Sequence, residues 1–417
     1  MAKFLITGGK KLSGEIRVSG SKNAVLPIMA ASLLSQEESV ISRVPKIRDV
    51  ETMVAILRDL GAVVDWSDHT LRIRPDNIAK TELNAELVAK LRGSILLLGS
   101  LLGRLKKVKM AYPGGDLIGR RPITVHLEAF KNLGCEVFVS DQIQILAGKL
   151  RGGKIILEES SVTATENAIQ AAVLASGTTV IKLAAMEPHV QQLCQFLNKM
   201  GAKISGIGTT TLTIEGVQKL HGAQIELIPD SNEAASFITL AAATKSHVTV
   251  THLNPDFLDD LLIKFKKMQV NFEVGNDFVR IKKPLADYIG AKIQCGLYPK
   301  LPSDDVPALA VLATQAVGES LVDEWLYENR LGYVEQLKKM GAKVEILDPH
   351  RVKIAGPTKL YGAKLTSYDI RMGVTMVIAA LVAEGQSEIE GIEHIDRGYE
   401  NLEERLVNLG AEIKRLG

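Results

Sequence analysis

Apolar residues recur along this chain at the spacing of amphipathic helices, and six such helices end in nearly the same three residues. Each end has a bulky apolar residue, then usually a glycine, then a small residue. These ends begin at Leu60, Leu133, Met200, Met268, Met340 and Leu409, which lie 67 to 73 residues apart. A spacing this long is not that of helical or propeller repeats. It predicts six copies of one structural unit.

The apolar positions inside these helices repeat as well. The first copy has a stripe at helical spacing formed by Val50, Met53, Val54, Leu57 and Leu60. The fourth copy repeats these offsets from Leu258 to Met268. A left-handed glycine just after the last apolar position is a common way to end a helix. The pattern therefore predicts, in each copy, a helix with one buried face that ends at a fixed point of the repeat.

A second kind of helix is predicted upstream of each amphipathic helix, where the chain is rich in alanine and leucine. These stretches are residues 24–34, 94–105, 168–175, 237–243, 308–316 and 374–383. A helix that is apolar on all sides belongs inside a core. β-Branched segments follow, for example residues 39–41, 178–181 and 247–250. We therefore predict an α/β fold in which each unit has a buried helix, a surface helix and several strands.

The chain has 417 residues, more than one hydrophobic core usually holds, so that two domains of three units are expected. The boundary is predicted near Pro229-Asp230. The opening strands, residues 3–7 and 14–18, are expected to complete the sixth unit. One domain then comprises residues 1–20 plus 230–417, and the other comprises residues 21–229. Two crossings of the chain between domains favour a hinge.

Composition narrows the class of protein. The net charge is +2, and no run of lysine or arginine builds a basic stripe that could follow a phosphate backbone. Three cysteines without paired spacing favour free thiols in a reducing compartment, and the sequence has no zinc signature. The longest apolar runs are about half a membrane span, and the N-terminus has no signal-peptide architecture. We expect a soluble, cytoplasmic protein that binds neither nucleic acid nor membrane.

Polar residues interrupt the common pattern at one place in each unit, near the start of the buried helix. Six of them share the period of the repeat: Asn23, Arg92, Asn167, Glu233, Asp305 and Arg371. Ordinary helix capping would explain Asn23, Asp230, Ser303 and Asp304. It does not explain the cations Lys22, Arg92 and Arg371, because positive charge at a helix N-terminus is unfavourable unless an anion compensates it. If the buried helices run parallel, their starts favour a polyanionic ligand.

Two further segments depart from the repeat. Residues 112–122, here called the lid, contain three glycines, Asp116 and the pair Arg120-Arg121. A plain surface loop would explain the glycines, whereas two arginines beside one acid favour anion binding. The second segment, His394 to Glu400, leads into the last helix; capping would occupy its acids but leaves Arg397 without a structural task.

Taken together, Lys22-Asn23, the lid motif Pro-Gly-Gly-Asp-x-Ile-Gly-x-Arg-Pro and the terminal His-Ile-Asp-Arg-Gly-Tyr-Glu resemble those of the enolpyruvyl transferases, over essentially the whole chain. The resemblance implies a two-domain inside-out α/β barrel of six repeated two-helix units, three in each domain. It also implies transfer of the enolpyruvyl group of phosphoenolpyruvate to the 3′-hydroxyl of UDP-N-acetylglucosamine, with release of phosphate, the first committed step of peptidoglycan precursor synthesis. A monomer that needs neither a metal nor an organic cofactor is expected.

The resemblance assigns catalytic roles to Asp116, Asp304, Lys22 and Arg397. Asp116 is the acid of the lid and Asp304 contacts the attacking hydroxyl. Phosphoenolpyruvate is expected to be held by Lys22, Asn23, Arg121, Arg371 and Arg397, with Arg330 joining on closure. The positions implied for the nucleotide sugar are Asn23, Arg92, Arg121, Pro122, Ile123, Thr124, Val125, Ser161, Val162, Thr163, Asp304 and Leu326. Asp369 stands near Arg371 at the start of the sixth buried helix.

The sequence departs from the family at several positions. Most members have cysteine where Asp116 stands, and because fosfomycin alkylates that thiolate, this chain is expected to be insensitive. Thr163 replaces a usual glycine, Ser231 replaces a common arginine, and Leu331-Gly332-Tyr333 replaces Phe-Met-His. These departures leave the acceptor open.

Three alternatives share features with this sequence. A related transferase that takes shikimate 3-phosphate would carry Lys-Ser in place of Lys22-Asn23. A non-enzymatic ring of six units, such as a DNA clamp, would need basic residues on an inward helix face. A degenerate homologue that only binds nucleotide sugar is disfavoured by the intact Lys22, Asp116, Asp304 and Arg397.

Overall fold

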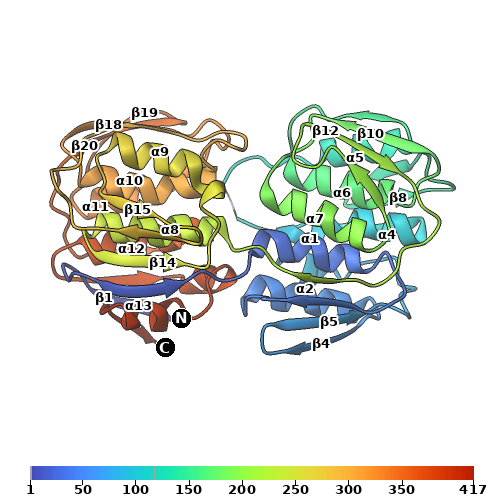
Figure 1. Cartoon of the computed structure of the whole chain (residues 1–417), viewed down its shortest axis with the longest axis horizontal. Coiled ribbons are helices and arrows are strands. Elements are labelled where there is room, and N and C mark those ends of the chain that lie inside the picture. The colour runs from blue at the N-terminus through green and yellow to red at the C-terminus, as the bar shows by residue number, and fades with distance from the viewer. Residues whose placement is uncertain (1, 117) are drawn as a thin grey trace. The chain divides into compact units, whose positions relative to one another are not determined.

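The computed structural model describes residues 2–116 and 118–417, so that Met1 and Leu117 of the lid lie outside the described residues. The chain forms two compact units, and the colour in Figure 1 follows the residue number through both of them. The first unit comprises residues 2–19, 116, 118–120 and 229–417, and the second comprises residues 20–115 and 121–228. Asp116 and residues 118–120, which we expected with the rest of the lid in the second domain, therefore group with the first unit.

The second unit contains seven α-helices and one 3-10 helix among its described residues: α1 (Lys22–Ser32), α2 (Arg48–Asp59), α3 (Ala85–Val88), η1 (Arg92–Leu96), α4 (Leu97–Leu105), α5 (Thr124–Asn132), α6 (Val162–Ala172) and α7 (Pro188–Lys199). Its strands are β3 (Ser39–Ser42), β4 (Val63–Ser67), β5 (Thr70–Arg74), β6 (Lys107–Ala111), β7 (Glu136–Val139), β8 (Gln142–Leu146), β9 (Lys154–Ile156), β10 (Thr178–Lys182), β11 (Lys203–Ser205), β12 (Thr211–Glu215) and β13 (Gln224–Glu226).

The first unit has the helices α8 (Ser231–Ala243), η2 (Pro255–Leu258), α9 (Asp259–Lys267), η3 (Ser303–Asp305), α10 (Val306–Thr314), η4 (Arg330–Gly332), α11 (Tyr333–Lys339), α12 (Ile370–Val382), η5 (Ile392–Arg397) and α13 (Leu402–Asn408). Its strands are β1 (Lys3–Thr7), β2 (Ser13–Arg17), β14 (His247–Thr251), β15 (Phe272–Val274), β16 (Phe278–Ile281), β17 (Lys292–Gln294), β18 (Gly318–Asp323), β19 (Lys343–Asp348), β20 (Arg351–Gly356), β21 (Lys364–Thr366), β22 (Gln386–Glu390) and β23 (Glu412–Leu416).

The described strands form six sheets. Three belong to the second unit, with the strand orders β13-β3-β5-β4, β6-β8-β7 and β11-β12-β10-β9. Three belong to the first unit, with the orders β15-β16-β14-β2, β17-β18-β20-β19 and β21-β22-β1-β23. In three cases a parallel pair of strands encloses a buried helix in sequence: β9–α6–β10, β17–α10–β18 and β21–α12–β22. This is the strand–helix–strand arrangement of an α/β fold.

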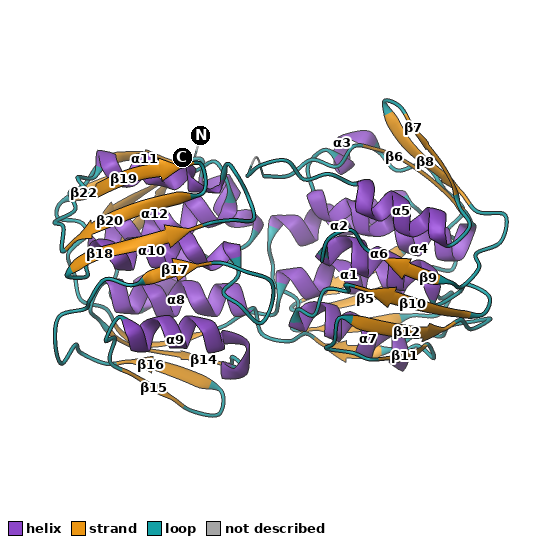
Figure 2. Ribbon diagram, turned by 90° about the horizontal axis from the view of Figure 1, so that it is seen from above, coloured by secondary structure: helices purple, strands orange, loops and turns teal. Residues whose placement is uncertain are grey.

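The helices predicted to be apolar on all sides form the core. Every residue of α10 is buried, and in α12 all residues but the last are buried. In the first unit α8, α10 and α12 pack against one another. Figure 2 shows α8, α10 and α12 in the middle of the first unit, with strands outside them. The α/β prediction is therefore confirmed. Among the described residues, no helix combines the length and apolarity needed to cross a membrane.

The predicted helix ends are confirmed by the backbone angles. The glycines at positions 61, 134, 201, 341 and 410 all have positive φ, directly after the last buried apolar residue of a surface helix. In the fourth copy, which lacks glycine, Gln269 takes the left-handed conformation with φ 61°. The repeat therefore demands this backbone conformation even where the residue disfavours it.

One prediction about the opening strands is wrong. β1 does complete the sixth sheet, where it pairs with β22 and β23. β2, however, pairs in parallel with β14 in the sheet of the fourth unit, with Ile16 beside Val250. Both residues are buried, so that this register places the one buried side chain of β2 on the core face. The chain then leaves β2 for α1 of the second unit.

Candidate functional site

Three helix starts meet at Asp304 in the first unit. Asp304 lies in η3, directly before α10. One of its carboxylate oxygens, Oδ2, accepts hydrogen bonds from Asn232 Nδ2 of α8 at 3.1 Å and from Arg371 Nε of α12 at 2.8 Å. The starts of the three buried helices of this unit therefore converge, which is the arrangement predicted from the repeat.

Arg330 adds a second guanidinium to this cluster. Its Nη2 donates to Asp304 Oδ1, so that both carboxylate oxygens of Asp304 face cations. Burial alone would lower the pKa of Arg371, but Asp304, Tyr399 and Asp230 together outweigh burial, so that the pKa of Arg371 is raised well above its ordinary value. Both arginines remain charged in this setting.

Asp305, the next residue, has the opposite character. Its side chain is buried, and its Oδ1 has no hydrogen-bond partner. Burial raises the pKa of Asp305 well above its ordinary value, although Arg371 acts in the other direction. Two adjacent carboxyl groups thus differ in their surroundings, because Asp304 is paired with two guanidinium groups while Asp305 is buried with Oδ1 unpartnered.

Tyr399 of the terminal motif holds Arg371 in place. Its hydroxyl accepts a hydrogen bond from Arg371 Nη1 at 3.0 Å, and the guanidinium carbon lies 5.7 Å from the centre of the ring. The same hydroxyl is 2.7 Å from Ser236 Oγ of α8. Tyr399 was not among the predicted site residues; its place two positions after Arg397 in the terminal motif was the available signal.

The described part of the lid that groups with the first unit carries Asp116. Its carboxylate accepts a hydrogen bond from Arg397 Nη1, and both side chains are mostly buried. Nearby, the Arg120 N–H donates to Glu328 Oε1 at 2.9 Å, and the Asn329 N–H donates to the carbonyl of Ile118 at 3.1 Å. The acid of the lid and the arginine of the terminal motif, 281 residues apart, are therefore direct partners.

The remaining predicted residues lie in the second unit. Lys22 is the first residue of α1, and its Nζ lies 3.2 Å from Asp49 Oδ2. Arg92 begins η1, and its Nη2 donates to the carbonyl of Arg121 at 2.5 Å. A Cβ on Gly115 would lie 2.6 Å from the Cβ of Arg92, so that this glycine allows the lid backbone to approach Arg92.

The predicted nucleotide-sugar residues of this unit fall at two helix starts. Pro122 to Val125 lead into α5, and Ser161 caps α6 by accepting from the N–H of Ala164. Thr163 Oγ1 lies 2.9 Å from Nε2 of His126, which was not among the predicted site residues. His126 is buried, and burial, helped by the charge of Arg92, lowers its pKa to about 3.

Two members of the periodic polar set make structural contacts; Glu233 stands in the first turn of α8, whereas Asn167 lies beyond the start of its helix. Asn167 lies in the second turn of α6, where its side chain accepts from the N–H of Gly99 at 2.7 Å and donates to the carbonyl of Ile95 at 3.0 Å. Glu233 pairs with Arg405 and accepts from the N–H of Ser19. The six periodic polar residues therefore occupy equivalent positions in the repeat, but they do not all have the same role.

Of the other predicted residues, Asp369 and Asn23 lie at helix starts, and Leu326 lies in the segment between β18 and η4. Asp369 caps α12, where its Oδ1 accepts from the N–H groups of Arg371 and Met372 at 2.8 Å. Leu326 is partly buried and its N–H donates to Glu324 Oε1 at 3.2 Å. Asn23 follows Lys22 in the first turn of α1 and is partly buried.

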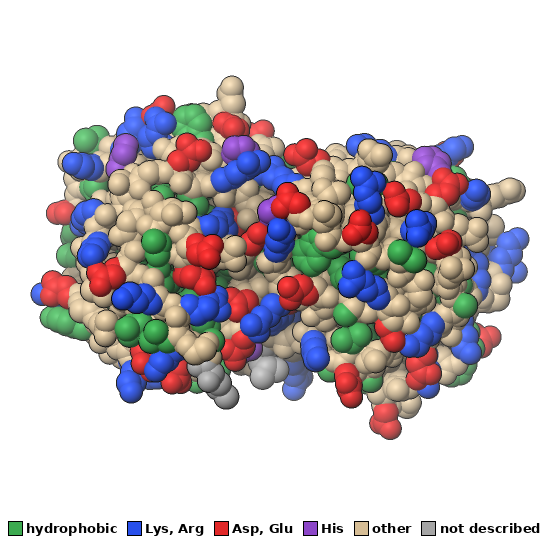
Figure 3. All heavy atoms as spheres, turned by 90° about the horizontal axis from the view of Figure 1, so that it is seen from below, with side chains coloured by type: hydrophobic (Ala, Val, Ile, Leu, Met, Phe, Trp, Pro, Cys, Tyr) green, Lys and Arg blue, Asp and Glu red, His purple; other side chains and the backbone are tan. Residues whose placement is uncertain are grey.

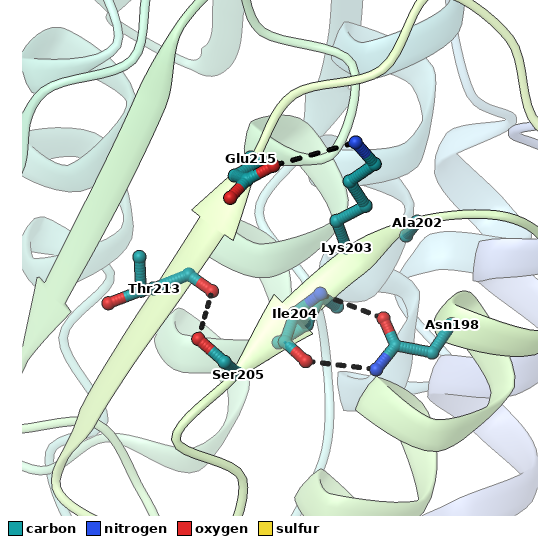
Figure 4. A pocket seen from close by; sticks show the side chains of 7 residues that line it. All are labelled: Asn198, Ala202, Lys203, Ile204, Ser205, Thr213 and Glu215. Carbon is teal, nitrogen blue, oxygen red and sulfur yellow. Dashed lines mark hydrogen bonds and ion pairs between the residues drawn. The ribbon is translucent and has the colours of Figure 1, made fainter.

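A surface hollow of about 230 Å³ lies elsewhere in the second unit (Figure 4). It is lined by β11, β12 and the end of α7. In it Asn198 bonds the backbone of Ile204, and Lys203 lies 3.6 Å from Glu215. None of the residues predicted to bind or react lines it.

Comparison with known proteins shows the family to which the chain belongs. The sequence model of the family described as EPSP synthase (3-phosphoshikimate 1-carboxyvinyltransferase) matches residues 6–406. The UDP-N-acetylglucosamine 1-carboxyvinyltransferase of Borreliella burgdorferi is 43% identical over 100% of this chain and 99% of its own length. The protein of that name from Bradyrhizobium diazoefficiens is 42% identical over 99% of this chain and 98% of its own.

Two solved structures share the fold. The enolpyruvyl transferase NikO from Streptomyces tendae superposes with a TM-score of 0.90 at 24% identity, covering 99% of this chain and 98% of its own. An EPSP synthase from Acinetobacter baumannii gives a TM-score of 0.78 at 19% identity over 100% of both chains. The chain therefore belongs to the enolpyruvyl transferase family, in the branch of the UDP-N-acetylglucosamine 1-carboxyvinyltransferases.

Proposed function

We propose that this enzyme transfers the enolpyruvyl group of phosphoenolpyruvate to the 3′-hydroxyl of UDP-N-acetylglucosamine and releases phosphate. The observation that carries the proposal is the cluster of Asp304, Arg330 and Arg371, because it joins a carboxylate to two guanidinium groups where three buried helices begin. The two guanidinium groups suit the anionic groups of phosphoenolpyruvate, and the carboxylate suits the hydroxyl that attacks its C2.

The chemistry is an addition followed by an elimination. Protonation of C3 of phosphoenolpyruvate makes C2 electrophilic, and the sugar hydroxyl then attacks C2. The tetrahedral intermediate loses a proton from C3 and expels phosphate, which restores the double bond. We assign the proton at C3 to Asp116 and contact with the attacking hydroxyl to Asp304. General acid–base catalysis of this kind contributes about 10²–10⁴-fold per group.

The anionic groups of phosphoenolpyruvate are assigned to Lys22, Asn23, Arg121, Arg371 and Arg397. Arg371 and Arg397 pair with Asp304 and Asp116, so that a bound phosphate or carboxylate would compete with these two carboxylates. Competition of this kind would release both acids for proton transfer at the moment the substrate binds. Arg330 is assigned to the same anion.

The nucleotide sugar is assigned to Asn23, Arg92, residues 121–125, residues 161–163, Asp304 and Leu326. The starts of α5 and α6 supply backbone N–H groups, which favour the diphosphate. Arg92 adds positive charge next to the carbonyl of Arg121.

The finer architecture belongs to the same proposal. Six sheets and the buried helices they surround support six copies of one unit, three in each of two domains, arranged as an inside-out α/β barrel. A monomeric, cytoplasmic enzyme that needs no cofactor is part of this proposal, and the three buried free cysteines agree with a reducing compartment.

Phosphate release from phosphoenolpyruvate tests the function. We expect release with UDP-N-acetylglucosamine as acceptor and none with shikimate 3-phosphate, the acceptor that the matching family description names. The reverse result would assign the enzyme to the other branch. If neither acceptor causes phosphate release but UDP-N-acetylglucosamine still binds, the protein is a homologue that only binds nucleotide sugar.

A further inference from the structure

We infer that Glu324 is a positioning residue that holds the turn carrying Asp304 and the segment carrying Leu326 in one fixed arrangement. The inference rests on the proposed function, because Asp304 and Leu326 matter only if they bind the acceptor. Glu324 itself directly follows β18 in the first unit.

The backbone of Glu324 is fixed from both sides. Its N–H donates to the carbonyl of His350 at 2.8 Å, and its own carbonyl lies 2.7 Å from His350 Nδ1. The side chain is completely buried, with 0% exposed. The carboxylate is therefore a rigid point in the first unit.

Hydrogen bonds from three separate segments end on this carboxylate. Ser303 Oγ donates to Oε2 at 2.8 Å, while the Leu326 N–H and Cys295 Sγ donate to Oε1 at 3.2 Å each. A buried carboxylate that loses such a donor is strongly disfavoured, so that these bonds are maintained in the folded protein. Two of the three donors belong to segments with assigned roles.

The bond from Ser303 matters most because Ser303 directly precedes Asp304 in η3. The carboxylate of Asp304 is held by Arg330 and Arg371, which are assigned to the anionic substrate. When these guanidinium groups bind a phosphate or carboxylate of the substrate, the hydrogen bond from Ser303 to Glu324 still fixes the backbone next to Asp304. Misplacement of a reacting group by about 1 Å can cost 10²-fold in rate.

Steady-state kinetics of Ser303→Ala test the inference. We expect kcat to fall about 10- to 100-fold, while KM for UDP-N-acetylglucosamine changes less than about threefold, because the variant disturbs alignment more than binding. Ser303→Thr keeps the hydroxyl and is expected to restore kcat to within about threefold of the wild-type value.

Cys295→Ala is the matched control. It removes a hydrogen bond from the same carboxylate, but Cys295 lies in a segment with no assigned site residue. We expect its melting temperature to fall as in Ser303→Ala while its kcat stays near the wild-type value. Wild-type kcat in Ser303→Ala, or an equal loss of kcat in Cys295→Ala, would overturn the inference. A wild-type enzyme that releases no phosphate with UDP-N-acetylglucosamine would overturn the proposed function, and this inference with it.

Discussion

Individual side chains of the candidate site are paired with partners far away in the sequence. Asp304 contacts Asn232 and Arg371, which are 72 and 67 residues away, and Asp116 contacts Arg397. Arg371 and Arg397 stand out in the sequence because helix capping does not explain these cations, whereas Asp116 and Asp304 are assigned by resemblance to the family. Which acid pairs with which arginine could not be predicted, since these pairs form only when separate repeats pack together.

Asp116→Asn is expected to lower kcat at least 10²-fold, because an amide cannot supply the proton for C3. Binding of UDP-N-acetylglucosamine, measured by isothermal titration calorimetry, is expected to stay within about threefold of the wild type. Asp396→Asn is a suitable control, since Asp396 pairs with Arg415 and has no assigned role. Wild-type turnover in Asp116→Asn would show that the acid has been assigned wrongly.

Fosfomycin is expected to leave this enzyme active. The lid has Asp116 at the position where a thiolate would be alkylated, and the three cysteines are buried elsewhere. Burial raises the pKa of Cys135 to about 11, which makes it a poor nucleophile. Intact-mass spectrometry after incubation with the drug and UDP-N-acetylglucosamine should show no adduct. In Asp116→Cys, an added mass is expected; an adduct on the wild-type chain would contradict the prediction.

Glu166→Gln is expected to stabilise the second unit at neutral pH. Glu166 is buried in α6 with Oε1 unpartnered, and burial, reinforced by Glu187, raises its pKa well above the ordinary value. Above the ordinary pKa the unfolded chain ionises this carboxyl while the folded chain keeps it protonated, so that stability falls as pH rises. The slope is about 1.4 kcal/mol per pH unit until the folded-state pKa is reached.

Melting temperatures measured by calorimetry from pH 4 to pH 8 test whether stability falls as pH rises. The advantage of Glu166→Gln over the wild type is expected to vanish near pH 4 and to grow with pH. Glu128→Gln, a change at the surface of α5, is the control and should show no such trend. An advantage independent of pH would indicate a packing effect instead.

At the scale of elements, each surface helix ends in a residue with positive φ. The ends of these helices could be predicted from the apolar spacing and the glycine that follows it, because a helix end is set by local sequence. The partner of β2 could not, since a five-residue strand with one buried side chain fits several sheet edges, and the packing of whole units chooses among them.

Gln269→Gly is expected to stabilise the first unit by roughly 0.5–1 kcal/mol, because glycine accepts the left-handed φ of 61° without a Cβ clash. Gly410→Ala is the converse change. Its added Cβ would have open space, so that strain at φ 93° alone is expected to destabilise by about 1 kcal/mol. Urea unfolding followed by circular dichroism measures both; equal shifts of the same sign would refute the account.

At the scale of the whole molecule, charge is balanced. The net charge is +2, and on the face drawn in Figure 3 lysine and arginine side chains are interspersed with aspartate and glutamate. A surface of this kind releases few counterions from a nucleic acid.

Duplex DNA is therefore expected to remain unbound at about 10 μM protein and low salt, by fluorescence anisotropy. A basic DNA-binding domain of known affinity serves as the positive control for the assay. A rise in anisotropy that disappears as salt increases would contradict the prediction.

The sequence by itself determined the α/β class, the period of the repeat, the helix ends and the set of residues that packing could not explain. The helices and their ends follow from spacings of a few residues, which local sterics and burial translate directly into helices and turns. Only the tertiary structure decided that β2 joins β14, that Asn167 ties α6 to α4, and that Glu324 joins the Ser303 and Leu326 segments. These contacts depend on how separate units pack against one another, and the distance between two packed side chains is not encoded in their separation along the chain.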